Sequence, residues 1–351
     1  MLLERLSEAH GVSGREEEVR SIVLSEIRGR VDDCRIDGVG NLIAHRKGTG
    51  ASSLRVLLAA HMDEVGLMIT LAEDSGLLRF AKVGGIDDRV LPARTVLIGP
   101  KKVPGVIGMK PVHLTDNAER NKVVESRQLV IDIGASSKAE AEKLVQRGDT
   151  AVFATRYRSL AGEGSAWRTV QGKAFDDRVG CTLLVELLAE RFPFALSAAF
   201  TVQEEVGLRG AKVVAYAENP DAAVVLECTG ANEVPTPLDV SPSTRVGGGA
   251  AITIRDTSFI ADPRLVELFA STAHRLGIAH QFKQPNIGGT DAGVIHKSRA
   301  GIPSITIAVP ARYIHSPAAI MDLRDFDATL ALVREALQSL PQALSSQGAR
   351  T

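Results

Sequence analysis

Four runs of apolar residues recur along this 351-residue chain, each about as long as one strand. The runs are LRVLLAA (54–60), ALSAAFTV (195–202), DAAVVL (221–226) and PSITIAV (303–309). A continuous apolar run is typical of a strand that is buried on both faces. Apolar stripes at helical spacing predict helices over 177–192, 262–276 and 325–340. This alternation predicts an α/β fold with a mostly parallel sheet flanked by helices.

A different pattern interrupts the alternation between about residues 67 and 164. Short apolar stretches separated by Gly, Pro and polar turns predict a small inserted β-barrel or sandwich there. The stretches are GLMITLA, LLRFAKV, RTVLIG, GVIGMK, QLVIDIG and TAVFATRY. Polar, aperiodic residues 112–128 predict a mobile loop within the insertion. We therefore expect a discontinuous main domain of residues 1–66 and 165–351 and an inserted domain of residues 67–164.

Composition argues against several classes of partner. A net charge of -1 gives no positive field for nucleic acid or an anionic membrane. No run of about 20 apolar residues is present to span a membrane. The first residues, MLLERLSEAHG, form an amphipathic helical pattern and not a signal peptide. Three scattered cysteines without a CxxC motif favour a reducing, cytoplasmic location.

Imidazoles and carboxylates follow the predicted strands. Functional groups of parallel sheets collect beyond the carboxyl ends of the strands, and five segments deliver such groups there. They are His61 and Asp63, Asp176 and Asp177, Glu204 and Glu205, Glu227, and His315. Each segment alone has a simpler explanation, since a strand-end histidine can be structural, an Asp pair can cap a helix and a Glu pair can form a solvated turn. All of these would have to coincide, which favours one shared site.

This set of ligands suits Zn²⁺, Co²⁺ or Mn²⁺. One tetrahedral ion cannot use all five candidates, which are His61, Asp176, Glu205, Glu227 and His315. A carboxylate bridging two ions about 3.5–4 Å apart resolves the count, and a bridging Asp176 leaves each ion one histidine and one terminal carboxylate. In HMD, Asp63 fits a carboxylate that orients a ligand histidine.

Two local features carry separate expectations. Ser13 and Glu16 predict a capping box at the start of a helix. Adjacent strand residues point to opposite faces, so Glu204 and Glu205 are expected to have different roles. The chain must bend for both side chains to reach one site, and Gly207 is the residue that suggests the position of the bend.

Seven stretches are distinctive when taken together: GVSGREEEV (11–19), DGVGNLIA (37–44), AAHMDEVG (59–66), GKAFDDRVG (172–180), VQEEVGLRGA (202–211), GGTDAG (288–293) and RYIHSP (312–317). In order and over essentially the whole chain, they resemble a family of dinuclear metallo-aminopeptidases. The family includes tetrahedral aminopeptidase and glutamyl aminopeptidase, and members are sometimes labelled endoglucanase. The resemblance implies two divalent metal ions per subunit and a dimerising inserted domain, with dimers that assemble into a tetrahedral dodecamer.

The resemblance also implies a role for each site residue. One ion would be held by His61 and Glu227 and the other by Glu205 and His315. Asp176 would bridge them.

Four further implications concern the surroundings of the metal ions. Glu204 would be the general acid and base, and Asp63 would orient His61. Asp291 would lie near the substrate, and the peptide bond between Asp176 and Asp177 would be cis. One departure is Glu227, because relatives often carry Asp at that position, and this substitution leaves the substrate class open.

The predicted function is removal of N-terminal residues from peptides. A water between the two ions would pass a proton to Glu204, and the resulting hydroxide would attack the scissile carbonyl. Glu204 would then protonate the leaving amine. A related metal-dependent deacylase or carboxypeptidase remains an alternative. A glycoside hydrolase is a weaker one, because Glu204 and Glu205, on opposite faces of a strand, could not flank one glycosidic bond.

Overall fold

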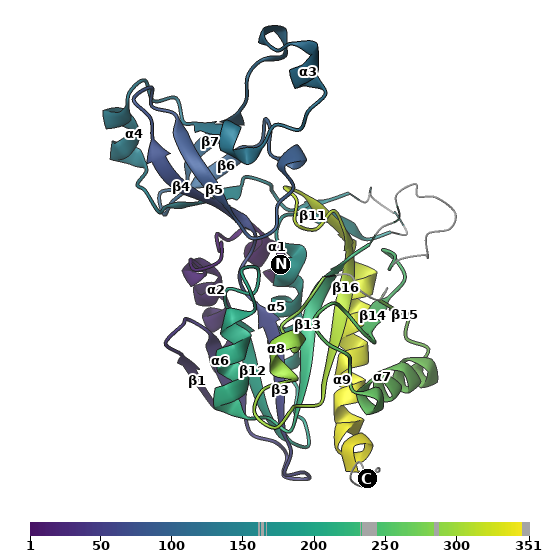
Figure 1. Cartoon of the computed structure of the whole chain (residues 1–351). Helices are drawn as coiled ribbons and strands as arrows, with labels where there is room; N and C mark the ends of the chain where they lie inside the picture. The colour runs from purple at the N-terminus through teal and green to yellow at the C-terminus, as the bar shows by residue number, and fades with distance from the viewer. Residues whose placement is uncertain are drawn as a thin grey trace.

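The computed structural model describes residues 1–160, 162, 165, 167–231, 233, 244–283 and 288–345. A large helix-covered sheet forms the main body, and a β-barrel stands at one end of it (Figure 1). The predicted α/β architecture with an inserted barrel is therefore confirmed. Among the described residues, none of the helices combines the length and apolar character that a membrane span requires.

The large sheet has 11 strands, and its main path is parallel only at its centre. From one edge its main path is β1 (Asp33–Ile36), β2 (Leu42–Arg46), β12 (Ala195–Thr201), β3 (Arg55–His61), β13 (Ala222–Gly230), β16 (Ser304–Arg312), β17 (Ala319–Asp322), β11 (Thr169–Gly172) and β10 (Arg158–Ser159). Off this path, β14 (Ala250–Thr253) pairs with β16 and with β15 (His280–Phe282).

The four central strands, β12, β3, β13 and β16, are parallel, and they are the four apolar runs of the sequence. The strands beyond β12 and β16 on the main path run antiparallel to their neighbours, so the sheet is mixed. These outer strands are short and lack long apolar runs, so the sequence pattern did not mark most of them.

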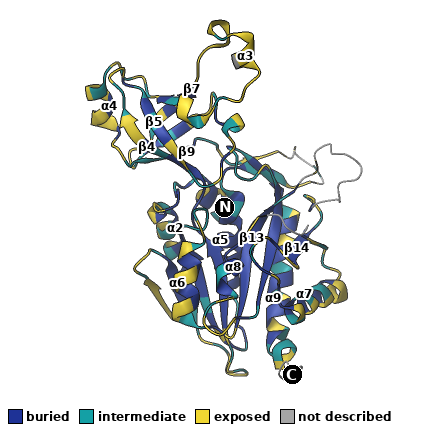
Figure 2. Ribbon diagram, in the orientation of Figure 1, coloured by how far each residue is buried: buried dark blue, intermediate teal, exposed yellow. Residues whose placement is uncertain are grey.

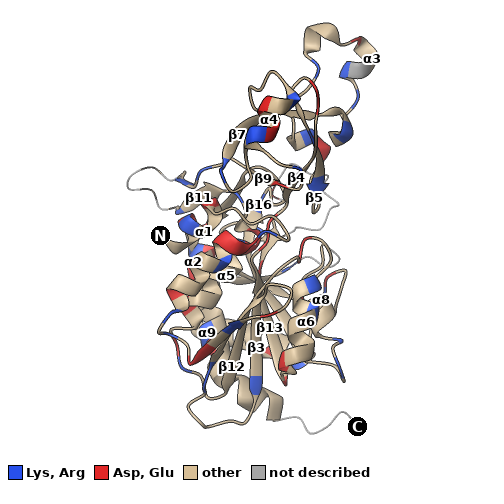
Figure 3. Ribbon diagram, turned by 90° about the vertical axis from the view of Figure 1, so that its left-hand side faces the viewer, with Lys and Arg blue, Asp and Glu red and all other residues tan. Residues whose placement is uncertain are grey.

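Helices cover both faces of the sheet. One face carries α1 (Leu2–Glu8), α2 (Glu17–Ile27), α5 (Phe175–Leu187) and α9 (Leu323–Ser345), and α7 (Pro263–Leu276) packs against α9. The other face carries α6 (Arg209–Glu218) and the short α8 (Ala292–Ile295). Figure 3 shows α2, α5 and α9 on one side of the central strands and α6 and α8 on the other. The dark central strands of Figure 2 mark the core between these layers.

The barrel is closed by six antiparallel strands around its own apolar core. In order around the barrel they are β4 (Gly66–Ala72), β5 (Leu78–Val83), β8 (Val130–Asp132), β7 (Val103–Gly108), β6 (Thr95–Ile98) and β9 (Thr150–Phe153). Each strand overlaps one of the six stretches predicted from the sequence. The helix α4 (Lys138–Leu144) was not predicted, because seven residues are too few for a helical period to stand out.

The predicted loop 112–128 contains short helical turns. They are two 3₁₀ turns, Val112–Leu114 and Ser126–Gln128, and the helix α3 (Asn117–Arg120). Figure 2 shows this excursion to be largely exposed, and its mobility stays a prediction. The chain rejoins the large sheet at β10, and the predicted boundary at residue 164 lies outside the described residues.

A buried cluster of charges joins the N-terminal segment to the edge of the sheet that carries the candidate ligands. Glu64 accepts hydrogen bonds from Lys173 Nζ at 2.7 Å and from Arg178 Nη2 at 3.0 Å. Arg178 Nε also donates to the carbonyl of Met62, and Lys173 Nζ to that of Ala9. Burial lowers the pKa of Lys173 to about 8 despite its carboxylate partner. The cluster fixes the start of α5 against the residues that follow β3.

Candidate metal centre

All five predicted ligands meet at the carboxyl edge of the central strands. His61 is the last residue of β3, and Glu227 lies within β13. Glu205 follows β12, and His315 follows β16 with a positive φ of 56°. Asp176 stands in the first turn of α5, which begins a few residues after β11.

Asp176 lies between the two imidazoles. Its Oδ1 is 3.1 Å from His61 Nε2, and its Oδ2 is 3.3 Å from His315 Nε2. One carboxylate therefore presents one oxygen to each histidine, which is the arrangement that a bridging ligand needs.

A further carboxylate accompanies each imidazole. Glu227 Oε2 lies 3.7 Å from His61 Nε2, and Glu205 Oε1 lies 3.6 Å from His315 Nε2. The side chains thus form two half-sites that share Asp176.

Asp177 is a candidate ligand that the sequence reasoning missed. Its carboxylate approaches His61 and Glu227 closely enough for the three to hold one ion. It also accepts hydrogen bonds from the backbone N–H of His61 at 3.1 Å and of Gly180 at 2.9 Å. The peptide bond between Asp176 and Asp177 is cis, as the resemblance implied. The signal was the Asp doublet itself, whose second member could have been a ligand as well as a cap.

Asp63 contacts His61 and also the backbone of both glutamates of the doublet. His61 Nδ1 hydrogen-bonds the backbone carbonyl of Asp63 at 3.1 Å and is 3.5 Å from its carboxylate. That carboxylate accepts from the backbone N–H groups of Glu204 at 2.9 Å and Glu205 at 3.1 Å, and from the Ser13 hydroxyl at 2.6 Å.

The predicted capping box is wrong. The helix α2 begins after Glu16, whose side chain makes no cap hydrogen bond to it. Ser13 donates to Asp63 instead, and Glu16 accepts from the backbone N–H of Gly14 and of Gln203. Ser13 and Glu16 each make a hydrogen bond to a residue distant in sequence, Asp63 and Gln203, which a local motif cannot predict.

The bend that both glutamates need lies before them. β12 ends at Thr201, and Gln203 has a positive φ of 57°. Gly207, with a φ of 119°, belongs to the turn that follows the doublet. Glu204 and Glu205 are therefore not strand residues, and the argument from alternating strand faces does not apply to them.

Crowding of buried carboxylates dominates the electrostatics. Burial, with repulsion from neighbouring carboxylates, raises the pKa of Glu204 to about 9 and that of Glu205 to about 7. Burial also opposes charge on Asp176, yet hydrogen bonds from His315 and His61 hold its pKa below the ordinary value. The pKa of His315 rises to about 10, because the hydrogen bond to Asp176 outweighs burial. A cationic partner would relieve the repulsion.

Asp291 is buried next to Thr201, the last residue of β12. Its Oδ2 accepts a hydrogen bond from the Thr201 hydroxyl at 2.6 Å, and burial raises its pKa to about 6.

The donor set fits a metal ion. Imidazole nitrogens and carboxylate oxygens are the groups that bind Zn²⁺, Co²⁺ and Mn²⁺. Glu205 Oε1 is buried without a hydrogen-bond partner and lies beside His315, so a coordinated cation would satisfy it.

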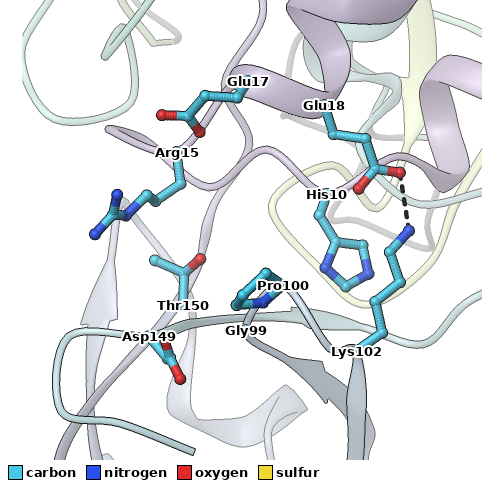
Figure 4. Close-up of a pocket in the computed structure, with 9 residues that line it drawn as sticks. All are labelled: His10, Arg15, Glu17, Glu18, Gly99, Pro100, Lys102, Asp149 and Thr150. Atoms are coloured by element: carbon cyan, nitrogen blue, oxygen red, sulfur yellow. Dashed lines mark hydrogen bonds and ion pairs between the residues drawn. The ribbon is translucent and has the colours of Figure 1, made fainter.

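A cavity of about 480 Å³ opens beside His315, and its walls combine residues 313–318 with Gly85, Asp87, Val90 and Arg94. Another cavity, of about 350 Å³, lies between α2 and the barrel. Figure 4 shows the residues that line it, among them the ion pair of Lys102 and Glu18. None of the candidate ligands lines this second cavity.

The comparison with known proteins decides the family. Residues 40–332 match the family described as M42 glutamyl aminopeptidase. The chain belongs to this family. A lysyl aminopeptidase of Pyrococcus furiosus is 30% identical over 347 residues, which are 97% of this chain and 96% of the relative.

Solved structures agree with this assignment. The TET aminopeptidase of Thaumarchaeota archaeon SCGC AB-539-E09 is similar with a TM-score of 0.92 and 36% identity, covering 98% of both chains. The TET1 peptidase of Pyrococcus horikoshii, described as assembling into a tetrahedron or a large octahedral shell, matches with a TM-score of 0.83 and 36% identity. That match covers 96% of this chain and 99% of the other. The chain is a peptidase, and the predicted recognition of its family is confirmed.

Metal binding should stabilise the fold. We expect Zn²⁺ added to chelator-treated protein to raise its melting temperature, since a ligand at 100 times its Kd stabilises by about 2.7 kcal/mol. Asp176→Asn should lose most of the Zn²⁺-induced rise, while Asp74→Asn, at an exposed barrel position, should keep it. Scanning calorimetry with and without metal measures the increments. An Asp176→Asn variant that responds like the unmodified protein would contradict the assigned site.

Proposed function

We propose that this protein is a dinuclear metal-dependent aminopeptidase that removes N-terminal residues from peptides. The observation that carries the proposal is the carboxylate of Asp176 set between His61 and His315. His61 and Glu227 would hold one ion, His315 and Glu205 the other, and Asp176 both. The separations of these side chains support this division.

Bound ions would supply an acidified water and polarise the scissile carbonyl. The chain's own contribution is proton transfer and orientation. Glu204 would accept a proton from the attacking water and return it to the leaving amine. Burial and neighbouring carboxylates raise its pKa to about 9, and two bound cations would lower that pKa toward the range in which a carboxylate accepts a proton. Asp63 fixes its backbone and keeps His61 in place.

The substrate is proposed to be a peptide with a free α-amino group. A surplus of carboxylates surrounds the two histidines, so a positively charged amine would be attracted to this edge of the sheet. The cavity of about 480 Å³ next to His315 offers room for the side chain of an N-terminal residue. Asp291 would support the site from behind through Thr201.

A panel of chromogenic substrates tests the function. We expect hydrolysis of aminoacyl p-nitroanilides, loss of activity after chelation, and recovery with Zn²⁺, Co²⁺ or Mn²⁺. N-acetylated versions of the same compounds are the matched control and should resist cleavage. Cleavage of only the blocked compounds would favour the deacylase alternative, to which Glu227 in place of Asp points. Activity that survives proven metal removal would refute the mechanism.

Glu204 has its own test. Glu204→Gln removes a proton acceptor and should lower kcat by about 10²-fold or more. Both metal ions should remain bound, because Glu204 is not one of the proposed ligands. Glu186→Gln, an exposed change on α5, is the control for substitution itself. Steady-state kinetics and metal analysis of both variants decide the role, and a fully active Glu204→Gln would remove it.

We further propose that the barrel mediates assembly of identical subunits. Several large apolar side chains of the barrel region are exposed in the single chain: Leu71, Val106, Met109, Val112, Leu114 and Val123. Such a group of exposed apolar residues is typical of an interaction surface. The tetrahedron described for the Pyrococcus horikoshii relative supports a closed shell of subunits, and we propose that dimers build a tetrahedral dodecamer.

Assembly is expected to depend on this apolar surface. Light scattering should give a mass near twelve subunits for the unmodified protein. Leu114→Asp places a charge where the side chain is 61% exposed and should shift the mass toward smaller species. Ile260→Asp, at a 70% exposed position of the main body, should leave it unchanged. A Leu114→Asp variant with unchanged mass would place the interface elsewhere.

A further inference from the structure

The Glu204–Glu205 doublet lies in a segment that belongs to neither a strand nor a helix. β12 ends at Thr201 and α6 begins at Arg209. The left-handed Gln203 turns the chain between them. The backbone amides just after the strand therefore need acceptors from elsewhere, because buried N–H groups are rarely left unpaired.

Four consecutive amides, from residue 202 to residue 205, donate to side-chain oxygens of three distant residues. The bonds are Val202 N to Asn41 Oδ1 at 3.0 Å, Gln203 N to Glu16 Oε1 at 3.3 Å, Glu204 N to Asp63 Oδ1 at 2.9 Å and Glu205 N to Asp63 Oδ2 at 3.1 Å. Below we call residues 202–205 the catalytic loop.

Asn41 is locked in place for this contact. It is fully buried, and its Nδ2 donates to Asp37 Oδ2 at 2.7 Å and to the carbonyl of Gly210 at 3.1 Å. A Cβ on Gly210 would lie 2.2 Å from Asn41 Oδ1, so only glycine permits this approach. Asn41 thus hydrogen-bonds to both ends of the turn that carries the doublet, at Val202 N and at the carbonyl of Gly210.

Glu16 makes the second contact from a buried position. Glu16 is only 4% exposed. Its Oε1 accepts a hydrogen bond from Gly14 N at 2.6 Å as well as the one from Gln203 N. Its neighbours Arg15, Glu17 and Glu18 line the cavity of Figure 4 instead. In this run of charged residues, Glu16 is the one that reaches the catalytic loop.

We propose that Glu16 and Asn41 are positioning residues for the catalytic loop. They act on Glu204 and Glu205 through the backbone and are not among the proposed metal ligands. Their segments, residues 11–19 and 37–44, supply none of the proposed ligands. The catalytic consequence rests on the function proposed above for Glu204, whereas the effect on the loop does not.

Removal of the Glu16 carboxylate tests the proposal. Glu16→Ala should lower kcat by about 10- to 100-fold with KM changed less than about twofold, because a misplacement of about 1 Å can cost 10²-fold in rate. Glu16→Gln keeps a side-chain oxygen for the two amides and should recover most of the activity. Glu17→Ala, an exposed change on the adjacent residue, is the matched control. A merely structural role would lower the melting temperature without this split between kcat and KM.

Hydrogen exchange gives a readout that does not depend on activity. In Glu16→Ala the amides of the catalytic loop should exchange about tenfold faster or more, since they lose an acceptor and open more readily. The loop should exchange normally in Glu17→Ala and nearly normally in Glu16→Gln. Unchanged loop exchange together with an unchanged kcat in Glu16→Ala would overturn the proposal.

The two readouts also separate this proposal from the proposed function. If the unmodified protein shows no metal-dependent hydrolysis, the proposed function fails, and faster loop exchange in Glu16→Ala still supports the positioning role. If the unmodified protein is active and Glu16→Ala equals Glu17→Ala in both readouts, the positioning role alone fails.

Discussion

Repulsion among carboxylates at one edge of the central sheet is the constraint on which the rest of the structure depends. Asp176, Asp177, Glu204, Glu205 and Glu227 gather around two imidazoles, mostly out of water. Such a cluster is costly unless cations and hydrogen bonds compensate it. The parallel arrangement of the central strands provides the convergence, since their carboxyl ends all meet at this edge. The metal ions that the cluster favours would then stabilise the fold as well as serve chemistry.

The barrel takes part in the site as well as in the proposed assembly. His315 Nδ1 hydrogen-bonds the backbone carbonyl of Gly85, in the segment that follows the barrel strand β5, at 3.0 Å. A histidine ligand is oriented by the partner of its other ring nitrogen, so the inserted segment sets the direction of Nε2 toward Asp176 and Glu205. Asp63 provides the corresponding constraint for His61. Each half-site is therefore fixed from a different part of the chain.

The sequence predicted the features that leave a local pattern. The four central strands and the six barrel strands appear as apolar runs, and the five proposed ligands appear as strand-end polar groups. The features it missed are long-range contacts between side chains and backbone. Glu16 and Asn41 reach the catalytic loop across more than 160 residues of sequence. The ion pairs of Glu64 with Lys173 and Arg178 likewise form only in the folded chain, so their spacing in the sequence does not predict them.

The two adjacent glutamates have identical side chains, but their different positions give them different pKa values. Burial raises the pKa of both, but the neighbouring charge of His315 counteracts the rise at Glu205, whose pKa reaches only about 7, against about 9 at Glu204. Bound cations would lower both pKa values, so the proposed roles rest on position: Glu205 lies beside His315 and is placed to bind a cation, and Glu204 is left to transfer a proton. The bend at Gln203 brings both to one edge, and the contact with His315 distinguishes them.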